Sequence, residues 1–191
     1  MTRSESGRGD DPGRPEPLER LVRSIGGTEP RSRDAVHLYL DVSGSVESIL
    51  EPLHAAVRGV ERLIWRQVHL FSTDVVDVHA RDLERGVCQT TGGTSIAPVA
   101  RHIRRHGVRR AVVVTDGEVG FLGSKDEETL RGTILGVALT DGRQADGDLA
   151  RLARHVVVLA RMERGRRERA TETDEAARRV VARRAVVRGS R

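Results

Sequence analysis

Cysteine and aromatic residues are scarce in this chain of 191 residues, and each shortage excludes a class of function. The single cysteine, Cys88, excludes an intrachain disulfide framework and a zinc site built from cysteines, and nothing around it marks a nucleophile, so we expect it to be inert. Aromatic residues make up 2% of the sequence, so stacking on nucleic-acid bases is not expected as the main activity. The core must therefore consist of Val, Leu, Ile and Ala, which favours buried parallel strands.

Long apolar segments are also missing. No apolar run reaches the roughly 18 residues that a membrane-spanning helix needs. The first residues, MTRSESGRGDDPGRPEP, contain no apolar segment of the kind found in secretory signals. We therefore expect a soluble, cytoplasmic protein without a membrane partner.

Charge and composition divide the chain into three segments. The net charge is +5, but residues 161–191 alone carry 11 Arg against 5 acidic residues, a net of +6. We predict that residues 161–191 form a basic, Arg-rich tail that could be helical. Residues 1–33 are rich in Gly, Pro, Arg and Ser, and we predict them to be largely disordered apart from a short helix in PLERLVRSI. The folded domain is expected at residues 34–160.

Within residues 34–160, short apolar runs alternate with amphipathic stretches, which predicts a three-layer α/β fold with helices on both faces of a mostly parallel sheet. Apolar spacings of three and four predict helices, and short apolar runs predict strands. The predicted helices are 46–64, 96–103 ending at Gly107, and 148–154; the predicted strands are 36–40, 68–71, 75–79, 111–114, 133–139 and 155–160. The three residues between 71 and 75 suit a hairpin, which adds one antiparallel edge strand.

Hydroxyl and carboxylate residues follow the predicted strands and precede the second helix. Asp41, Ser43 and Ser45 follow the first strand, Thr94 lies before the second helix, and Asp116 ends the central strand. Because ligands of open α/β sheets bind beyond the carboxyl ends of the strands, these residues could converge. Oxygen donors without imidazole or thiolate select hard cations such as Mg²⁺, Mn²⁺ or Ca²⁺. A simpler reading, in which Asp41 and the serines only cap a helix, leaves Thr94 and Asp116 unexplained.

The same residues resemble a known family. Asp41, Ser43 and Ser45 look like the D-x-S-x-S start of the metal-ion-dependent adhesion site (MIDAS) of von Willebrand factor A (VWA) domains, and Thr94 and Asp116 match the threonine and second aspartate of that site. The resemblance covers residues 35–160 and implies a mostly parallel sheet wrapped by helices. It also implies that Ser43, Ser45 and Thr94 coordinate a metal ion directly, and Asp41 and Asp116 directly or through water.

The resemblance implies a function as well. VWA domains usually bind partner proteins, often through a partner Asp or Glu that completes the coordination of the metal. The short chain and its Gly-Gly-Thr segment are closer to bacterial intracellular members, many of which work beside AAA+ ATPases of the MoxR type. We therefore expect a metal-dependent protein-interaction module rather than an enzyme.

Two other classes of function stay open. Haloacid-dehalogenase-like phosphatases also begin with a strand that ends in Asp and bind Mg²⁺, so Asp41 could be a phosphorylated nucleophile with Thr115 and Lys125 as phosphate contacts. That family needs a second Asp two residues later, where this chain has Ser43, which cannot shuttle protons near neutral pH. The basic tail could instead bind nucleic acid, with a strong dependence on salt.

Structural roles are expected for several remaining polar residues. Glu118 is expected to be a solvated loop carboxylate, and Asp74 a turn residue. His102 and His106 lie one helical turn apart, a spacing that could bind zinc, but no third ligand is evident and the glutamate of an HExxH motif is absent. We therefore expect both to be solvated histidines on a helix face.

Overall fold

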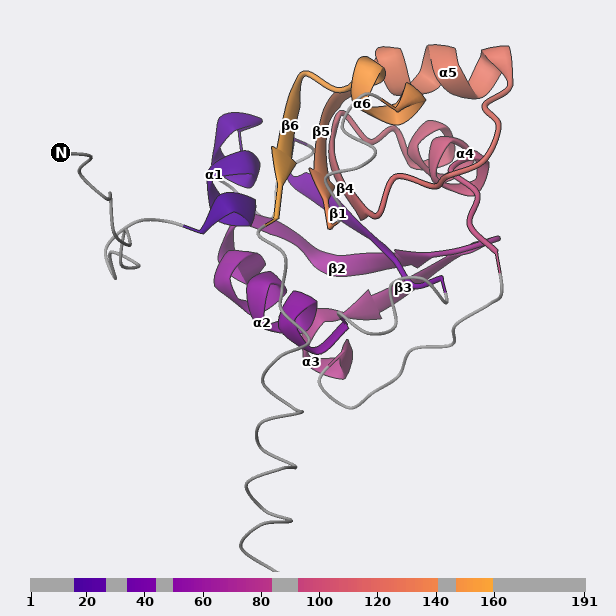
Figure 1. The fold of residues 1–191 in the computed structure, drawn as a ribbon. Helices are drawn as coiled ribbons and strands as arrows, with labels where there is room; N and C mark the ends of the chain where they lie inside the picture. Colours follow the sequence, from indigo (N-terminus) through magenta and orange to yellow (C-terminus); the bar gives the residue numbers. More distant parts are fainter. Residues whose placement is uncertain (1–15, 27–33, 44–49, 84–92, 141–146, 160–191) are drawn as a thin grey trace, which may run out of the picture. The chain divides into compact units, whose positions relative to one another are not determined.

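The computed structural model describes residues 16–26, 34–43, 50–83, 93–140 and 147–159 (Figure 1). These residues contain one six-stranded sheet with the order β3-β2-β1-β4-β5-β6. Neighbouring strands are parallel, except that the edge strand β3 runs antiparallel to β2. The strands are β1 (Val36–Asp41), β2 (Ile64–Phe71), β3 (Val75–His79), β4 (Arg110–Thr115), β5 (Ile134–Leu139) and β6 (His155–Val158). The predicted α/β class, the mostly parallel sheet and its antiparallel edge strand are confirmed.

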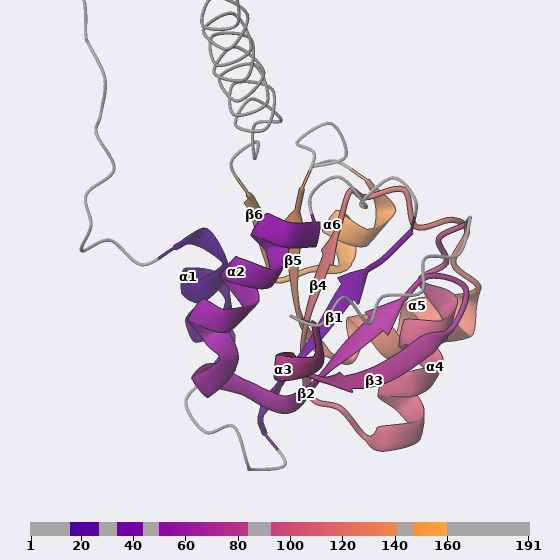
Figure 2. The same ribbon diagram turned by 90° about the horizontal axis from the view of Figure 1, so that it is seen from below.

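Helices cover both faces of the sheet, which makes three layers (Figures 1 and 2). The helices on one face are α1 (Pro17–Ser24), α2 (Leu50–Val60) and α3 (Ala80–Leu83); those on the other are α4 (Ala97–His106), α5 (Ser124–Arg131) and α6 (Asp148–Leu152). A 3-10 turn at Glu61–Leu63 joins α2 to β2. Each face therefore has its own hydrophobic core.

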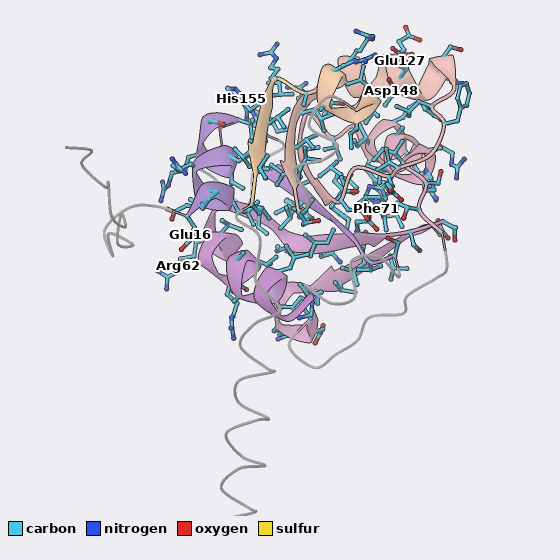
Figure 3. All side chains as sticks on the ribbon, viewed as in Figure 1. Glu16, Arg62, Phe71, Glu127, Asp148 and His155 are labelled. Atoms are coloured by element: carbon cyan, nitrogen blue, oxygen red, sulfur yellow. The ribbon has the colours of Figure 1, made fainter. Side chains whose placement is uncertain are left out.

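The alternation of side chains along β1 assigns its residues to the two cores. Leu38 and Leu40 pack with α1, α2 and α3, whereas Tyr39 packs on the opposite face with α4, α5 and α6. Phe71 belongs to this second core, and Figure 3 shows it on the inside of the domain, whereas the labelled charged residues project from the periphery. Because successive residues of a strand face opposite sides, Asp41 shares the face of Tyr39.

Helix α1 shows that the domain starts earlier than the predicted boundary at residue 34. The predicted short helix is present, and Leu18, Leu21 and Val22 are each at most 1% exposed against the sheet. Their spacing of three and four places one apolar stripe toward the core. The composition of residues 1–33 as a whole conceals this stripe, so the boundary prediction was wrong for α1.

A glycine in β5 makes room for α1. A Cβ atom at Gly136 would lie 3.0 Å from Leu21 Cδ1 and 3.4 Å from Val112 Cγ2. We expect Gly136→Val to lower the free energy of unfolding by about 1–3 kcal/mol, because the added methyl groups overpack this contact. Chemical denaturation measures the change, with Gly123→Ala as a control because a Cβ there meets nothing within 4 Å. An unchanged midpoint in Gly136→Val would contradict this packing.

Other differences from the predicted elements are local. Ile64, predicted as the end of a helix, begins β2, and neither α3 nor α5 was predicted. Gly107 ends α4 as predicted and has the left-handed φ of 61° that a glycine adopts most readily. The predicted tail at 161–191 lies outside the described residues. Among the helices that are described, none has the length and apolar character needed to cross a membrane.

Candidate functional site

Asp41 ends β1 in a fully buried position. Its side chain is inaccessible to solvent, Ser43 N donates to Asp41 Oδ1 at 2.9 Å, and Thr115 Oγ1 donates to Asp41 Oδ2 at 2.7 Å. Burial raises the pKa of the Asp41 carboxyl; the hydrogen bonds from Ser43 and Thr115 act in the opposite direction, and repulsion by Asp116 adds to the rise. The two hydrogen bonds, one to each carboxylate oxygen, thus hold the Asp41 side chain in one orientation.

Asp116 follows the neighbouring strand β4. Leu40 lies opposite Val114 in the parallel pairing of β1 and β4, so the two strands end side by side. Beyond this point the backbone turns, as Gly117 N donates to Thr115 Oγ1 at 3.1 Å and Glu118 N donates to Asp116 Oδ1 at 3.0 Å. The two carboxylates predicted as a pair therefore lie at the same edge of the sheet.

The segment that contains Thr94 is tied to this edge by its backbone. Ser95 N donates to the carbonyl of Ser72 at 2.7 Å, and Ile96 N donates to the carbonyl of Val119 at 3.0 Å. A Cβ atom at Gly120 would lie 3.3 Å from the carbonyl oxygen of Thr94, and Gly120 has a φ of 71°. The segments after β1, before α4 and after β4 thus meet at one end of the sheet.

The predicted site residues have different degrees of exposure. Ser43 is 3% exposed, whereas Thr94 and Asp116 are half-buried. Ser45 lies outside the described residues. The structure therefore brings four of the five predicted metal ligands to one edge, with hydroxyl and carboxylate oxygens as donors.

No chemical role was predicted for Glu118, Asp74 or Cys88. Glu118 is exposed, as predicted for a solvated loop carboxylate. Asp74 lies in the turn between β2 and β3, where its carboxylate accepts from Val75 N at 2.8 Å, so its prediction as a turn residue is confirmed. Cys88 lies outside the described residues.

His102 departs from the prediction of a solvated helix face. Its side chain is only 13% exposed; its Nδ1 lies 2.9 Å from the Tyr39 hydroxyl, and its Nε2 lies 3.5 Å from Asp77 Oδ1. The prediction was wrong because α4 packs this side of the helix against the sheet. His106, one turn further, is exposed as predicted, although its ring stacks on that of His102 with centroids 4.3 Å apart.

His102 belongs to a polar cluster that sequence analysis missed. Tyr39, His69 and Asp77 lie opposite one another on β1, β2 and β3. His69 Nδ1 donates to Asp77 Oδ1 at 2.7 Å, because the carboxylate can only accept. On its other side, His69 Nε2 lies 2.9 Å from His37 Nδ1. We call His37, Tyr39, His69, Asp77 and His102 the histidine cluster.

Electrostatics keep the histidines of this cluster neutral near pH 7. Burial, followed by repulsion from His69, lowers the pKa of His37 and of His102 to about 4. Burial also lowers the pKa of His69, against the opposing effect of Asp77. Partial burial alone would raise the pKa of Asp77, but the hydrogen bond from His69 and the nearby histidines outweigh it, and the pKa is lowered. Neutral imidazoles are the form that binds metal ions.

The signal for this cluster was present along the strands. His37, Tyr39 and Asp41 are alternate residues of β1, so their side chains lie on one face of the sheet. Two of them belong to the histidine cluster, and the third is the predicted metal ligand at the end of the strand. Only the pairing of three strands, however, shows which residues of β2 and β3 lie beside them.

In comparisons with known proteins, no family model and no curated protein matches this chain.

Proposed function

We propose that this chain is a metal-dependent protein-interaction module, which holds a divalent cation and binds an acidic residue of a partner protein. The cation would lie where β1 and β4 have their carboxyl ends, beside Asp41, Ser43, Thr94 and Asp116, and we call this place the carboxyl edge. The observation that carries the proposal is the convergence of Asp41, Thr94 and Asp116 from three separate segments on neighbouring elements. Two carboxylates beside hydroxyl groups are costly to hold together without a compensating positive charge.

The donor set suits a hard cation. Asp41, Ser43, Thr94 and Asp116 offer only oxygen atoms, and Ser45 would add another hydroxyl. Oxygen ligands favour Mg²⁺, with Mn²⁺ and Ca²⁺ as alternatives, over the softer transition metals. When bound, the cation would supply a Lewis-acidic position for an incoming anionic oxygen.

The chemical class of the partner follows from the charge of this donor set. Asp41 and Asp116 are the only carboxylates in the proposed set, and their two charges only just balance a divalent cation. Where an aspartate binds through water, as the resemblance implies it can, the directly bound donors are mainly neutral hydroxyls and leave positive charge on the ion. A partner Asp or Glu would complete the coordination with a negatively charged oxygen. The resemblance of these motifs to the MIDAS of VWA domains supports this reading, as does the sheet with a single antiparallel edge strand. An AAA+ ATPase system of the MoxR type is a partner that the same resemblance suggests.

The residue two positions after Asp41 disfavours the alternative of a phosphatase. A phosphatase of the haloacid-dehalogenase type uses a second Asp there as its general acid and base. Ser43 occupies that position in this chain, and its hydroxyl cannot shuttle protons near neutral pH. Nucleic-acid binding through the basic tail is a prediction that rests on residues outside the described part of the chain.

Capture experiments test the proposed function. The full chain, immobilised, is incubated with native lysate in Mg²⁺, and the same experiment is repeated in EDTA and with Asp116→Ala. We expect a partner that is retained only by the wild-type chain in Mg²⁺, and at least about tenfold weaker binding once the acidic residues of its contact segment are substituted. A partner retained equally in EDTA and by Asp116→Ala would contradict metal-dependent binding.

A further inference from the structure

A group of potential metal ligands lies within the histidine cluster, on residues that play no part in the carboxyl edge. His69, Asp77 and His102 each place one potential ligand atom within 4.8 Å of those of the other two residues. They come from β2, β3 and α4, which are three packed elements rather than one exposed loop. Two imidazoles and one carboxylate differ in kind from the oxygen-only donors at the carboxyl edge.

We propose that His69, Asp77 and His102 form a second metal site, one that takes Zn²⁺. Asp77 Oδ1 lies 2.7 Å from His69 Nδ1 and 3.5 Å from His102 Nε2. In a tetrahedral zinc site with bonds of about 2.0–2.2 Å, ligand atoms lie roughly 3.3–3.6 Å from one another. Both distances to Asp77 are within about 1 Å of this range, and the separation of at most 4.8 Å between ligand atoms leaves only modest side-chain movements to complete the site.

The second nitrogen of each histidine already has a partner, which is the arrangement that metal-binding histidines require. His102 Nδ1 lies 2.9 Å from the Tyr39 hydroxyl, and His69 Nε2 lies 2.9 Å from His37 Nδ1. With an ion on His69 Nδ1, the ring carries its proton on Nε2 and donates it to His37, so both rings stay neutral. Tyr39 and His37 thus hold the two ligand rings with their coordinating nitrogens toward Asp77.

The exposure of the three ligands suits a site that is rigid on one side and open on the other. The side chain of His69 is 2% exposed and that of His102 is 13% exposed, whereas Asp77 on the edge strand β3 is 39% exposed. His102 also borders an open hollow of about 440 Å³, which Asp74 and His106 line together with Arg101, Arg104 and Arg105. Three protein ligands leave a fourth position for water or an anionic ligand, and the positive charge of this hollow favours the anion.

The two sites can be distinguished by metal and by substitution. Mg²⁺ prefers oxygen ligands and would bind at the carboxyl edge, whereas imidazole ligands favour Zn²⁺. Asp116→Ala removes a ligand of the first site only, and Asp77→Asn removes a ligand of the second only. Failure of one proposal therefore leaves the other standing.

Zinc titration of the full, untagged chain tests the second site. After treatment with a chelator, Zn²⁺ is added in competition with a chromophoric chelator, and the folding of each variant is checked by circular dichroism. We expect one tight Zn²⁺ per wild-type chain, and at least tenfold weaker binding in Asp77→Asn and in His102→Gln. His155→Gln, at the exposed start of the edge strand β6, and Asp116→Ala are the controls that should bind Zn²⁺ as the wild type does.

A second measurement covers a variant that folds poorly. Zn²⁺ should raise the Tm of the wild-type chain and of Asp116→Ala, since it binds the folded state, and should leave that of Asp77→Asn unchanged. Asparagine at position 77 keeps an oxygen that can accept the hydrogen bond from His69, so Asp77→Asn is expected to fold. A wild-type chain that takes up no tight Zn²⁺, or Asp77→Asn and His102→Gln variants that bind it as tightly as wild type, would overturn the proposal.

Discussion

Removal of residues 1–33 is expected to lower the Tm of the domain by about 10 °C or more, or to unfold it. The deletion removes α1, whose Leu18, Leu21 and Val22, together with the following Ile25, are each at most 3% exposed. Burial of four such side chains contributes roughly 6–12 kcal/mol before the cost of ordering the helix. The free energy of unfolding of a domain is only about 5–15 kcal/mol, so the loss of even half of that contribution would lower the Tm strongly or unfold the domain.

A shorter deletion provides the matched control for α1. A chain that begins at residue 16 keeps α1 and loses only residues that precede the described part, so its Tm is expected to stay within about 2 °C of the full chain. Thermal unfolding followed by circular dichroism measures both. Equal midpoints for the chains that begin at residues 16 and 34 would mean that α1 contributes nothing to the domain.

Asp41→Ala and Asp116→Ala are both expected to abolish Mg²⁺ binding, but to differ in their effect on stability. Alanine at position 41 leaves the buried Thr115 hydroxyl and Ser43 N–H without their acceptor, which costs about 2–4 kcal/mol. Asp116 is half-buried and accepts one hydrogen bond, from Glu118 N, so its loss should cost less than about 1 kcal/mol. Removal of its charge also relieves repulsion of Asp41 in the metal-free chain.

Calorimetric titration with MgCl₂ and chemical denaturation in EDTA measure these two effects separately. Glu118→Ala is the control, because Glu118 is an exposed neighbour of Asp116 whose loss should change neither quantity. If Asp116→Ala is folded and binds Mg²⁺ with wild-type affinity, the assignment of the carboxyl edge as a metal site is wrong. Equal stability of both variants in EDTA would instead contradict the structural role given to Asp41.

Local sequence patterns were sufficient for most of the sheet. Four strands, β1, β3, β4 and β5, were predicted within one residue of their observed ends, because strands of this sheet are short apolar runs bounded by polar or turn residues. The three-residue turn between β2 and β3 predicted the antiparallel edge, since so short a connection cannot cross over to a parallel strand. The order of polar residues at strand ends then placed Asp41 and Asp116 at a common edge.

The sequence by itself therefore determined the fold class and the candidate metal ligands at the carboxyl edge, because strands and their end residues follow from local periodicity. Only the tertiary structure decided the place of α1 and the histidine cluster. The stripe of α1 becomes a core element only where Gly136 leaves space for Leu21. His69, Asp77 and His102 are separated along the chain and meet only through strand register and the packing of α4, which no local pattern records.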